Sequence, residues 1–238
     1  MVSSVAVYAG GVIALAGAIA LLRRRTRRAG AVLIAGGVGL AAVALAWPVS
    51  EDRVTNKVTH LDEAMPRWQF NEVHEIHVDA DPQRVYDAIH DVRADEIALF
   101  NLLTTIRRGG RKVPESILNA GRTKSLLEVA TSTSFIYLAA DAPREIVVGT
   151  VVVAPRGTRG RLTPEVFHKQ LRPGFALAAM NFVVTPDAHG SRVTTETRVY
   201  ANDPATARKF AVYWRVIHPG SDIIRRMWLR AIKRRAEA

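Results

Sequence analysis

Two long apolar runs open the chain and constrain its fold more than any other feature of the sequence. Residues 2–22 and residues 29–47 carry no charge and consist mostly of Ala, Val, Ile, Leu and Gly. Runs of about 20 apolar residues match the thickness of a bilayer core. The alternative is a buried helical hairpin in a soluble core, but two such runs at the start of a chain are rarely that. We therefore expect residues 1–48 to form a transmembrane helical hairpin in the cell membrane.

The loop between the runs predicts the orientation of the hairpin. Residues 23–28 contain five Arg, and this charge follows the first apolar run, whereas a secretory signal peptide carries its charge before the run. Short Arg-rich loops remain in the cytoplasm. The sequence therefore predicts a two-pass membrane protein whose C-terminal domain is extracytoplasmic. Glycines would allow the two helices to approach closely, and these are Gly10, Gly11, Gly17, Gly30, Gly36, Gly37 and Gly39.

At the other end of the chain, residues 203–238 have the pattern of one long amphipathic helix. We expect a break or kink near Pro219, because proline disfavours the helical conformation of the residue before it. Ser221 is then expected to cap the second half. An apolar stripe of this length needs a partner surface. Its members recur at three- and four-residue steps and are Phe210, Trp214, Ile217, Ile224, Trp228 and Ala231.

The intervening residues predict an α+β domain over residues 67–238, preceded by a polar linker at residues 49–66. Asp81 and Pro82 are typical of the start of a helix, and stretches rich in β-branched residues are typical of strands. The predicted order of elements favours an antiparallel curved sheet that grips the long C-terminal helix. Strands are expected at residues 68–79, 126–139, 145–154, 175–185 and 191–201, and a second short helix at residues 94–106.

Several segments resemble the helix-grip proteins of the START and polyketide-cyclase (SRPBCC) superfamily. Residues 72–89, EVHEIHVDADPQRVYDAI, resemble the first strand of that fold, which ends in Ala, a small residue and Pro before a helix containing Val and an aromatic residue. TETRV at residues 195–199, FAVYW at 210–214 and PGS at 219–221 resemble its end. The resemblance covers residues 68–236, and the N-terminal hairpin departs from the common pattern. It implies a hydrophobic ligand held between the sheet and the C-terminal helix, and some members catalyse cyclisation or dehydration.

The predicted strands supply the polar residues that a ligand site could use. Glu72 and His74 share strand parity with apolar neighbours, so they point into the pocket if that face is turned inward. Glu196 and Arg198 lie two residues apart on another strand, either as a cross-strand ion pair on the solvent side or as polar groups at the mouth of the cavity. The full set of cavity candidates is Glu72, His74, Tyr137, Glu196, Arg198, Tyr213 and Trp214.

Several kinds of chemistry lack their residues in this sequence. The chain has no Cys, which excludes disulfides, thiol nucleophiles and Cys-ligated zinc. His74 and His77 point to opposite faces of a strand and cannot chelate one metal together. The sequence has no zincin, Gly-rich phosphate-loop or nucleophile-elbow pattern, so we expect neither a metal nor a cofactor.

The formal net charge of +11 raises the question of nucleic acid as a partner. Basic stretches occur at residues 107–112, 156–161 and 225–235, but no nucleic-acid-binding motif accompanies them. On a membrane-anchored domain, basic residues more often meet anionic headgroups. The expected partners are therefore the membrane and a hydrophobic small molecule or lipid, and not nucleic acid. Two functions remain: a membrane-anchored binding module, and a cyclase or dehydratase-type enzyme that uses the same cavity.

Overall fold

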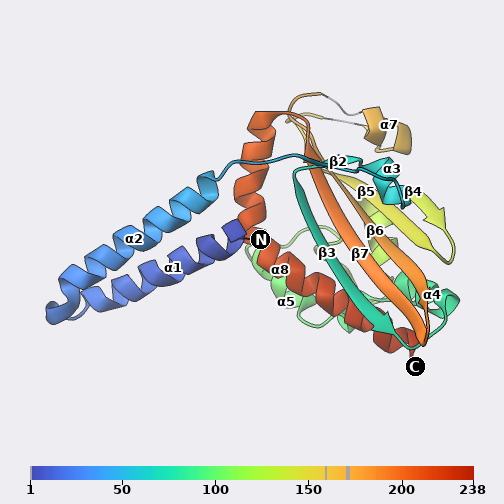
Figure 1. Ribbon diagram of the computed structural model, residues 1–238, viewed down its shortest axis with the longest axis horizontal. Coiled ribbons are helices and arrows are strands. Elements are labelled where there is room, and N and C mark those ends of the chain that lie inside the picture. Colours follow the sequence, from blue (N-terminus) through green and yellow to red (C-terminus); the bar gives the residue numbers. More distant parts are fainter. Residues whose placement is uncertain (1, 159, 170–171) are drawn as a thin grey trace. The chain divides into compact units, whose positions relative to one another are not determined.

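The chain is an α+β protein with two apolar helices at its N-terminus, a five-stranded antiparallel sheet and a long C-terminal helix (Figure 1). These elements confirm the predicted fold class. The computed structural model describes residues 2–158, 160–169 and 172–238.

The chain forms two compact units. The hairpin unit comprises the residues up to Val49 together with Arg208–Pro219. The sheet unit comprises Ser50–Ala207 and Gly220–Ala238. The long C-terminal helix therefore contributes residues to both units.

The hairpin unit contains helices α1 (Val2–Leu21) and α2 (Arg27–Ala46), joined by the short 3-10 turn η1 (Arg24–Thr26). Both long helices are of sufficient length and apolarity to cross a membrane.

Glycines bring α1 and α2 into backbone contact. A Cβ atom on Gly10 would lie 2.5 Å from the carbonyl oxygen of Gly37, and one on Gly17 would lie 2.7 Å from that of Gly30. No side chain fits at these distances, so these four positions require glycine. The remaining three predicted contact residues, Gly11, Gly36 and Gly39, have nothing within 4 Å of a Cβ atom and lie outside the contact.

The C-terminal helix α8 (Pro204–Ala236) begins with Asp203 as its cap and runs without interruption through Pro219. The predicted interruption of the helix near Pro219 is therefore wrong. An internal proline costs about 3 kcal/mol, and burial of apolar residues on both sides, such as Phe210 before it and Trp228 after it, offsets this cost. The expected cap at Ser221 is also wrong, because the Ser221 hydroxyl donates to Glu72 Oε1 at 2.9 Å.

The sheet unit is built on an antiparallel sheet with the strand order β3-β7-β6-β5-β4. The two longest strands, β6 and β7, form the hairpin that the sequence predicts. Gly190 in their turn has φ +141°, and a Cβ there would collide with the carbonyl oxygen of Val78. The strands are β3 (Phe70–Val78), β4 (Phe135–Asp141), β5 (Glu145–Val153), β6 (Ala176–Asp187) and β7 (Gly190–Ala201).

Short helices connect and cover the strands. Asp81 caps α4 with its carboxylate, as the sequence predicts. The predicted single helix over residues 94–106 is two elements, because Leu99 between them has a left-handed backbone with φ +62°. The helices are α3 (His60–Ala64), α4 (Pro82–Asp91), η2 (Ala94–Glu96), α5 (Phe100–Arg107), α6 (Leu126–Thr133) and α7 (Pro164–Lys169).

Two stretches differ from their predicted structure. The strand predicted at residues 126–139 is instead helix α6, capped by Ser125, followed by β4. Leu126, Leu127 and Val129 are buried, and they lie on this helix rather than on a strand. The prediction was wrong because it followed the β-branched composition of the stretch and not the helical spacing of these residues. All but the first residue of the predicted linker at residues 49–66 belong to the sheet unit, where β1 (Asp52–Arg53) pairs with β2 (Arg67–Trp68).

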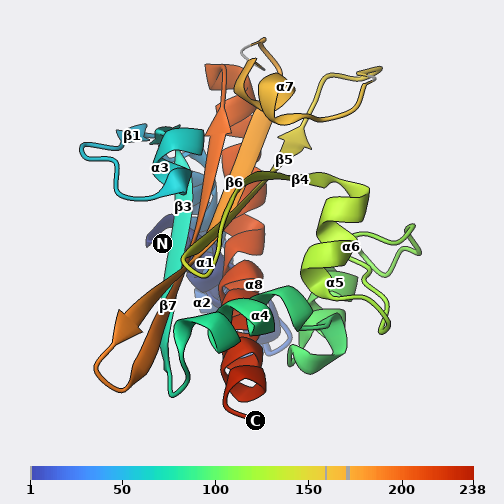
Figure 2. The same ribbon diagram turned by 90° about the vertical axis from the view of Figure 1, so that its right-hand side faces the viewer.

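The sheet has an apolar core on each face. On the first face, Val78, Phe182 and Trp228 are buried in the larger core, which includes residues of α4, α6 and the C-terminal part of α8. Figure 2 shows α4 and the C-terminal end of α8 close together at one end of the sheet. On the second face, Leu61 and Phe167 from α3 and α7 form a smaller core. We call these the inner face, which meets α8, and the outer face, which meets α3 and α7.

Candidate functional site

A polar cluster lies between the inner face of the sheet and the C-terminal half of α8. Strand β3 supplies Glu72 and His74, and β7 supplies Thr197, which pairs with Glu72 in the sheet register. Polar residues at positions 221, 222 and 225 of α8 interrupt the apolar stripe that includes Trp228. We define the interlayer cluster as Glu72, His74, Thr197, Ser221, Asp222, Arg225 and Trp228.

Helix α8 and strand β3 are joined by polar contacts within this cluster. Ser221 Oγ donates to Glu72 Oε1 at 2.9 Å, and Arg225 Nε lies 3.5 Å from the same oxygen. Arg225 also contacts the sulfur of Met180, and its guanidinium carbon lies 5.4 Å from the centre of the Trp228 ring. The cluster therefore contains a largely buried ion pair, Glu72 with Arg225, between the two layers.

Among the described residues, a buried polar atom in each of three members of the cluster has no hydrogen-bond partner. These atoms are Nε2 of His74, Oγ1 of Thr197 and Nε1 of Trp228. His74 Nε2 lies 3.6 Å from Asp222 Oδ1, which is too long for a hydrogen bond. Buried polar groups in folded proteins are nearly always hydrogen bonded, so three such atoms in one layer mark an unusual environment.

The electrostatics of the cluster favour a neutral His74. Burial lowers the pKa of His74 below its usual value, while the carboxylates of Glu72 and Asp222 oppose that effect. Burial also lowers the pKa of Arg225, again against the influence of Glu72. A neutral imidazole has one donor and one acceptor nitrogen, so His74 can offer either to a neighbouring group.

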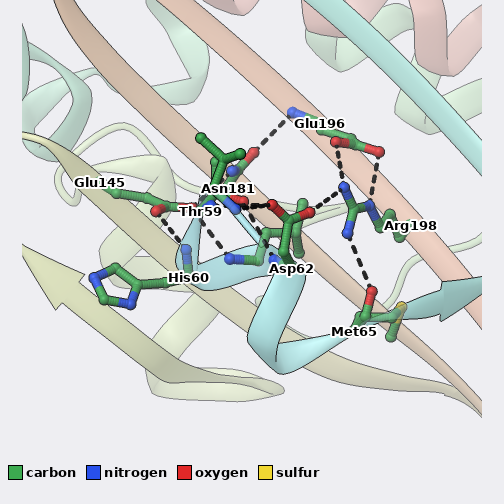
Figure 3. Close-up of polar contacts among 10 residues, drawn as sticks. Thr59, His60, Asp62, Met65, Glu145, Asn181, Glu196 and Arg198 are labelled. Atoms are coloured by element: carbon green, nitrogen blue, oxygen red, sulfur yellow. Dashed lines mark hydrogen bonds and ion pairs between the residues drawn. The ribbon is translucent and has the colours of Figure 1, made fainter. Parts of the chain in front are cut away.

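Arg198 and Glu196 lie in a buried network on the outer face (Figure 3). The sequence predicts them at a cavity mouth or on the solvent side, and the structure places them at neither. Arg198 is 5% exposed and donates from Nη2 to Asp62 Oδ1 at 2.8 Å and from Nε to Glu196 Oε1 at 2.7 Å. Its Nη1 donates to the carbonyl oxygen of Met65 at 3.2 Å. Its guanidinium carbon lies 4.1 Å from the centre of the Trp68 ring. All its nitrogens are thus engaged by protein groups.

A third carboxylate, Glu145, completes this network (Figure 3). Glu145 is fully buried, and it accepts from the backbone N–H groups of His60 and Leu61 at 2.7 and 3.2 Å and from Asn181 Nδ2 at 2.8 Å. These N–H groups open α3 and have no partner within that helix. We define the outer-face network as Asp62, Glu145, Asn181, Glu196 and Arg198.

The titration of Asp62 reflects its part in holding α3. Burial acts to raise the pKa of Asp62, but backbone N–H donors of Val58 and Thr59 and the Arg198 guanidinium together hold it below its usual value. Burial likewise acts to lower the pKa of Arg198, and the Glu196 and Asp62 carboxylates raise it overall. The network therefore keeps both charges and fastens α3 to the sheet.

The remaining predicted site residues do not join the interlayer cluster. Tyr137 lies on the edge strand β4 and is 40% exposed. In the register of the sheet, Val148 and Met180 separate it from Thr197 of the cluster. Tyr213 and Trp214 belong to the hairpin unit.

Among the described residues, no group of three or more His, Cys, Asp or Glu side chains is arranged to hold a metal ion. His74 and His77 differ in environment as well as in the face they occupy. His74 is buried on the inner face, whereas His77 is exposed and contacts Asp79 at 2.9 Å.

The predicted site lacked five members of the interlayer cluster: Thr197, Ser221, Asp222, Arg225 and Trp228, the last of which was predicted only as part of the apolar stripe. The sequence did contain a signal for Ser221 and Arg225, because their spacing of seven and three residues from Trp228 places them on the same face of a helix. Polar residues on an otherwise apolar stripe are therefore the pattern that points to this cluster.

Comparisons with known proteins give distant likenesses only. No family model matches the chain, and no match to a curated protein was found. The chain is similar to solved structures of protein MLL2253 from Mesorhizobium loti (11% identity, 69% of this chain and 98% of that chain, TM-score 0.35) and TTHA0849 from Thermus thermophilus (14%, 70% and 96%, 0.28). It is also similar to CalU16 from Micromonospora echinospora (13%, 80% and 93%, 0.28). These TM-scores are all below 0.5, so the likenesses establish neither a shared fold nor a shared function. The sheet and C-terminal helix of this chain are themselves compatible with a helix-grip fold.

Proposed function

We propose that this protein is a membrane-anchored helix-grip domain of the START and SRPBCC type that binds a hydrophobic small molecule or lipid between its sheet and α8. The observation that supports this most is the set of buried, unpartnered polar atoms of His74, Thr197 and Trp228. They come from β3, β7 and α8 and lie in the same layer. Each such atom costs about 1–3 kcal/mol when nothing bonds to it, and a bound ligand with a polar group would supply a partner.

The surroundings of the cluster favour a ligand that is mostly apolar. Met180 and Phe182 from β6 are buried on the same face, and the Phe182 and Trp228 rings lie 5.0 Å apart, edge to face. Ligand sites typically combine an apolar lining with a few placed polar groups. A hydroxyl or carbonyl at one end of an otherwise hydrophobic molecule fits this combination.

The anchor in this proposal is the hairpin of α1 and α2, which crosses the membrane twice. The Arg-rich loop at residues 23–28 stays in the cytoplasm, because short loops rich in Arg are retained there. The sheet unit is then extracytoplasmic. A reporter enzyme that works only after export, fused after Ala238, is expected to be active. An inactive export reporter beside an active cytoplasmic one would reverse the orientation.

Adjacent residues of β3 provide the test of ligand binding. His74→Phe places a bulky apolar side chain between the sheet and α8, whereas Glu75→Phe places the same side chain on the outer face, where Glu75 is 61% exposed. The full chain is purified in detergent, and the compounds bound to it are extracted and quantified by mass spectrometry. We expect a compound that copurifies with the wild type and Glu75→Phe and is lost from His74→Phe at unchanged thermal stability. Equal retention by both variants would contradict the proposed site.

A second candidate is a cyclase or dehydratase-type enzyme that uses the same space. It is favoured by the neutral His74 with Nε2 3.6 Å from Asp222, since a neutral imidazole near a carboxylate can accept and carry a proton. Extracted compounds distinguish the two functions. An enzyme in which His74 moves a proton accumulates a different compound, the unconverted substrate, when His74 is changed to Gln. A binding module retains the same compound in both proteins.

A further inference from the structure

The central part of α8, which belongs to the hairpin unit, is apolar around most of its circumference. From Phe210 to Ile217 the sequence is FAVYWRVI, with one charge. Phe210 and its neighbour are buried, whereas Val212, Tyr213 and Val216 are 45%, 41% and 46% exposed. These three recur at helical spacing on one face. In a helix whose exposed face meets water, that face is polar, so this face calls for a different environment.

The one charged residue in this stretch is turned away from solvent. Arg215 is 5% exposed and donates from Nη1 to the carbonyl oxygen of Leu45 at 2.6 Å and from Nη2 to that of Trp47 at 2.7 Å. These carbonyls lie at the C-terminal end of α2, where the last carbonyls of a helix have no partner of their own. Arg215 therefore ties residues 208–219 to the end of the second apolar helix.

A second contact ties the same segment to the start of the first apolar helix. The hydroxyl of Tyr8 donates to the carbonyl oxygen of Val216 at 2.6 Å. Tyr8 follows the first residue of α1, Val2, by six positions, which at 1.5 Å per residue is about 9 Å along the helix. Residues 208–219 thus lie beside the outermost turns of α1 and α2, at the end of the hairpin opposite the Arg-rich loop.

The composition at this end of the hairpin is that of a membrane interface. Three aromatic residues are exposed here, Tyr8 and Trp47 at 49% and 61% and Tyr213 on α8. Tyr and Trp are enriched where a span meets the headgroups. Arg208 and Lys209 are exposed one turn before Val212. Basic residues beside exposed apolar ones are typical of helices that lie in the headgroup region, with their apolar face about 5–10 Å deep.

We propose that residues 208–219 are a third membrane-associated segment, whose face of Val212, Tyr213 and Val216 is immersed in the boundary between headgroups and acyl chains. The lipid bilayer is the partner, because this segment is hydrogen bonded to the ends of both apolar helices and its exposed face combines apolar and aromatic residues with flanking basic ones. The inference rests on the proposal that α1 and α2 cross the membrane. It adds that the C-terminal helix, which carries Ser221 and Arg225 of the interlayer cluster, is itself held by the membrane surface.

The absence of Cys from the chain permits a direct test of depth. Single variants Val212→Cys and Val216→Cys are labelled with the fluorophore NBD, and the full chain is reconstituted in phosphatidylcholine vesicles. Leu15→Cys, at a position 63% exposed in the second half of α1, reports insertion of the hairpin. Ala188→Cys, in the exposed β6–β7 turn, reports an aqueous site. Lipids that carry a nitroxide near the glycerol quench NBD labels at shallow depth, and lipids that carry it near the chain end quench labels deep in the bilayer.

We expect labels at 212 and 216 to be quenched by the shallow nitroxide about twofold more than by the deep one, with the reverse order at Leu15 and little quenching at Ala188. If Leu15 is quenched but 212 and 216 behave as Ala188 does, the interfacial segment is overturned while the spanning hairpin stands. Self-quenching between labelled copies at 212, without lipid quenching, would assign this face to a second copy and also overturn it. An unquenched Leu15 would refute the spanning hairpin together with the inference.

Discussion

Both faces of the sheet bury charged side chains, but they differ in how fully the buried polar atoms are hydrogen bonded. On the outer face, Arg198 donates to three groups and Glu145 accepts from three donors, all within the protein. On the inner face, His74 and Thr197 each bury an atom that none of the described residues bonds. Burial of charge alone therefore does not indicate a binding site. An incomplete set of hydrogen bonds is the better guide.

The contrast has one qualification within the described residues. Buried unpartnered atoms also occur at Arg108 and Asn202, away from the cluster. In both, other atoms of the same side chain are bonded: Arg108 donates to Asn119 at 2.5 Å, and Asn202 accepts from the N–H of Phe175 at 3.1 Å. The inner face differs in gathering such atoms from three elements into one layer.

The largest expected effect is the loss of Arg198. Arg198→Ala leaves the carboxylates of Asp62 and Glu196 without their cation, and breaking a buried ion pair in this way costs about 3–5 kcal/mol. Arg192→Ala on the same strand is the matched control, because its pair with Glu75 is 52% and 61% exposed, and exposed pairs contribute about 0–1 kcal/mol. Denaturant unfolding of the full chain in detergent measures both. Equal, small losses would show that the outer-face network does not hold the domain together.

Two threonines on the inner face of β7 compare a bonded hydroxyl with an unbonded one. Thr195 donates to the carbonyl oxygen of Asn181 at 2.7 Å, whereas Thr197 Oγ1 has no partner in the described part of the chain. Thr195→Val should reduce the free energy of unfolding by about 1 kcal/mol, whereas Thr197→Val in ligand-free protein should leave it unchanged or raise it. Thr197→Val should nevertheless reduce retention of the copurified compound. Equal losses of stability from both changes would mean that Thr197 is as well bonded as Thr195.

The smallest expected effect concerns the pH dependence of His74. Burial lowers the pKa of His74 in the folded protein, so the unfolded chain takes up the proton first as the pH falls. Its contribution to stability is therefore present above the unfolded value of about 6.5 and is lost as the pH falls below it. His74→Gln should flatten this part of the stability profile.

The control for this titration is His90, whose pKa burial also lowers. His90→Gln should remove its own part of the dependence of unfolding free energy on pH. The contribution of His74 is the difference between the pH profiles of the wild type and His74→Gln, and that of His90 is the difference between the wild type and His90→Gln. A wild-type slope in His74→Gln would mean that His74 titrates alike in the folded and unfolded chains.

The sequence predicted the elements with strong local signals. The two apolar runs became α1 and α2, and Asp81 with Pro82 became the start of α4. Strand parity also correctly paired Glu72 with His74 and Glu196 with Arg198. Parity does not reveal which face each pair occupies. The register sets Glu72 opposite Thr197 rather than Glu196, and a shift of one residue in register moves every side chain to the other face.

The rest of the site depended on contacts between distant residues. Glu72 meets Ser221 and Arg225 across 149 and 153 positions in the chain, and no local pattern predicts which residues of α8 will face which strand. The outer-face network was missed for the same reason, since α3 lies in a stretch that reads as a polar linker. Its apolar contacts, Leu61 and Met65, are too few to give a periodic signal.

The most direct test of the central claim locates a bound hydrophobic molecule on one face of the sheet. The full chain in detergent is irradiated with a diazirine-bearing fatty acid, and the labelled peptides are mapped by mass spectrometry with and without excess unlabelled fatty acid. The account predicts competed labelling on β3, β7 and residues 221–228 of α8, with uncompeted labelling on α1 and α2. Labelling confined to the two apolar helices, or competed labelling on the outer face around Arg198, would contradict it.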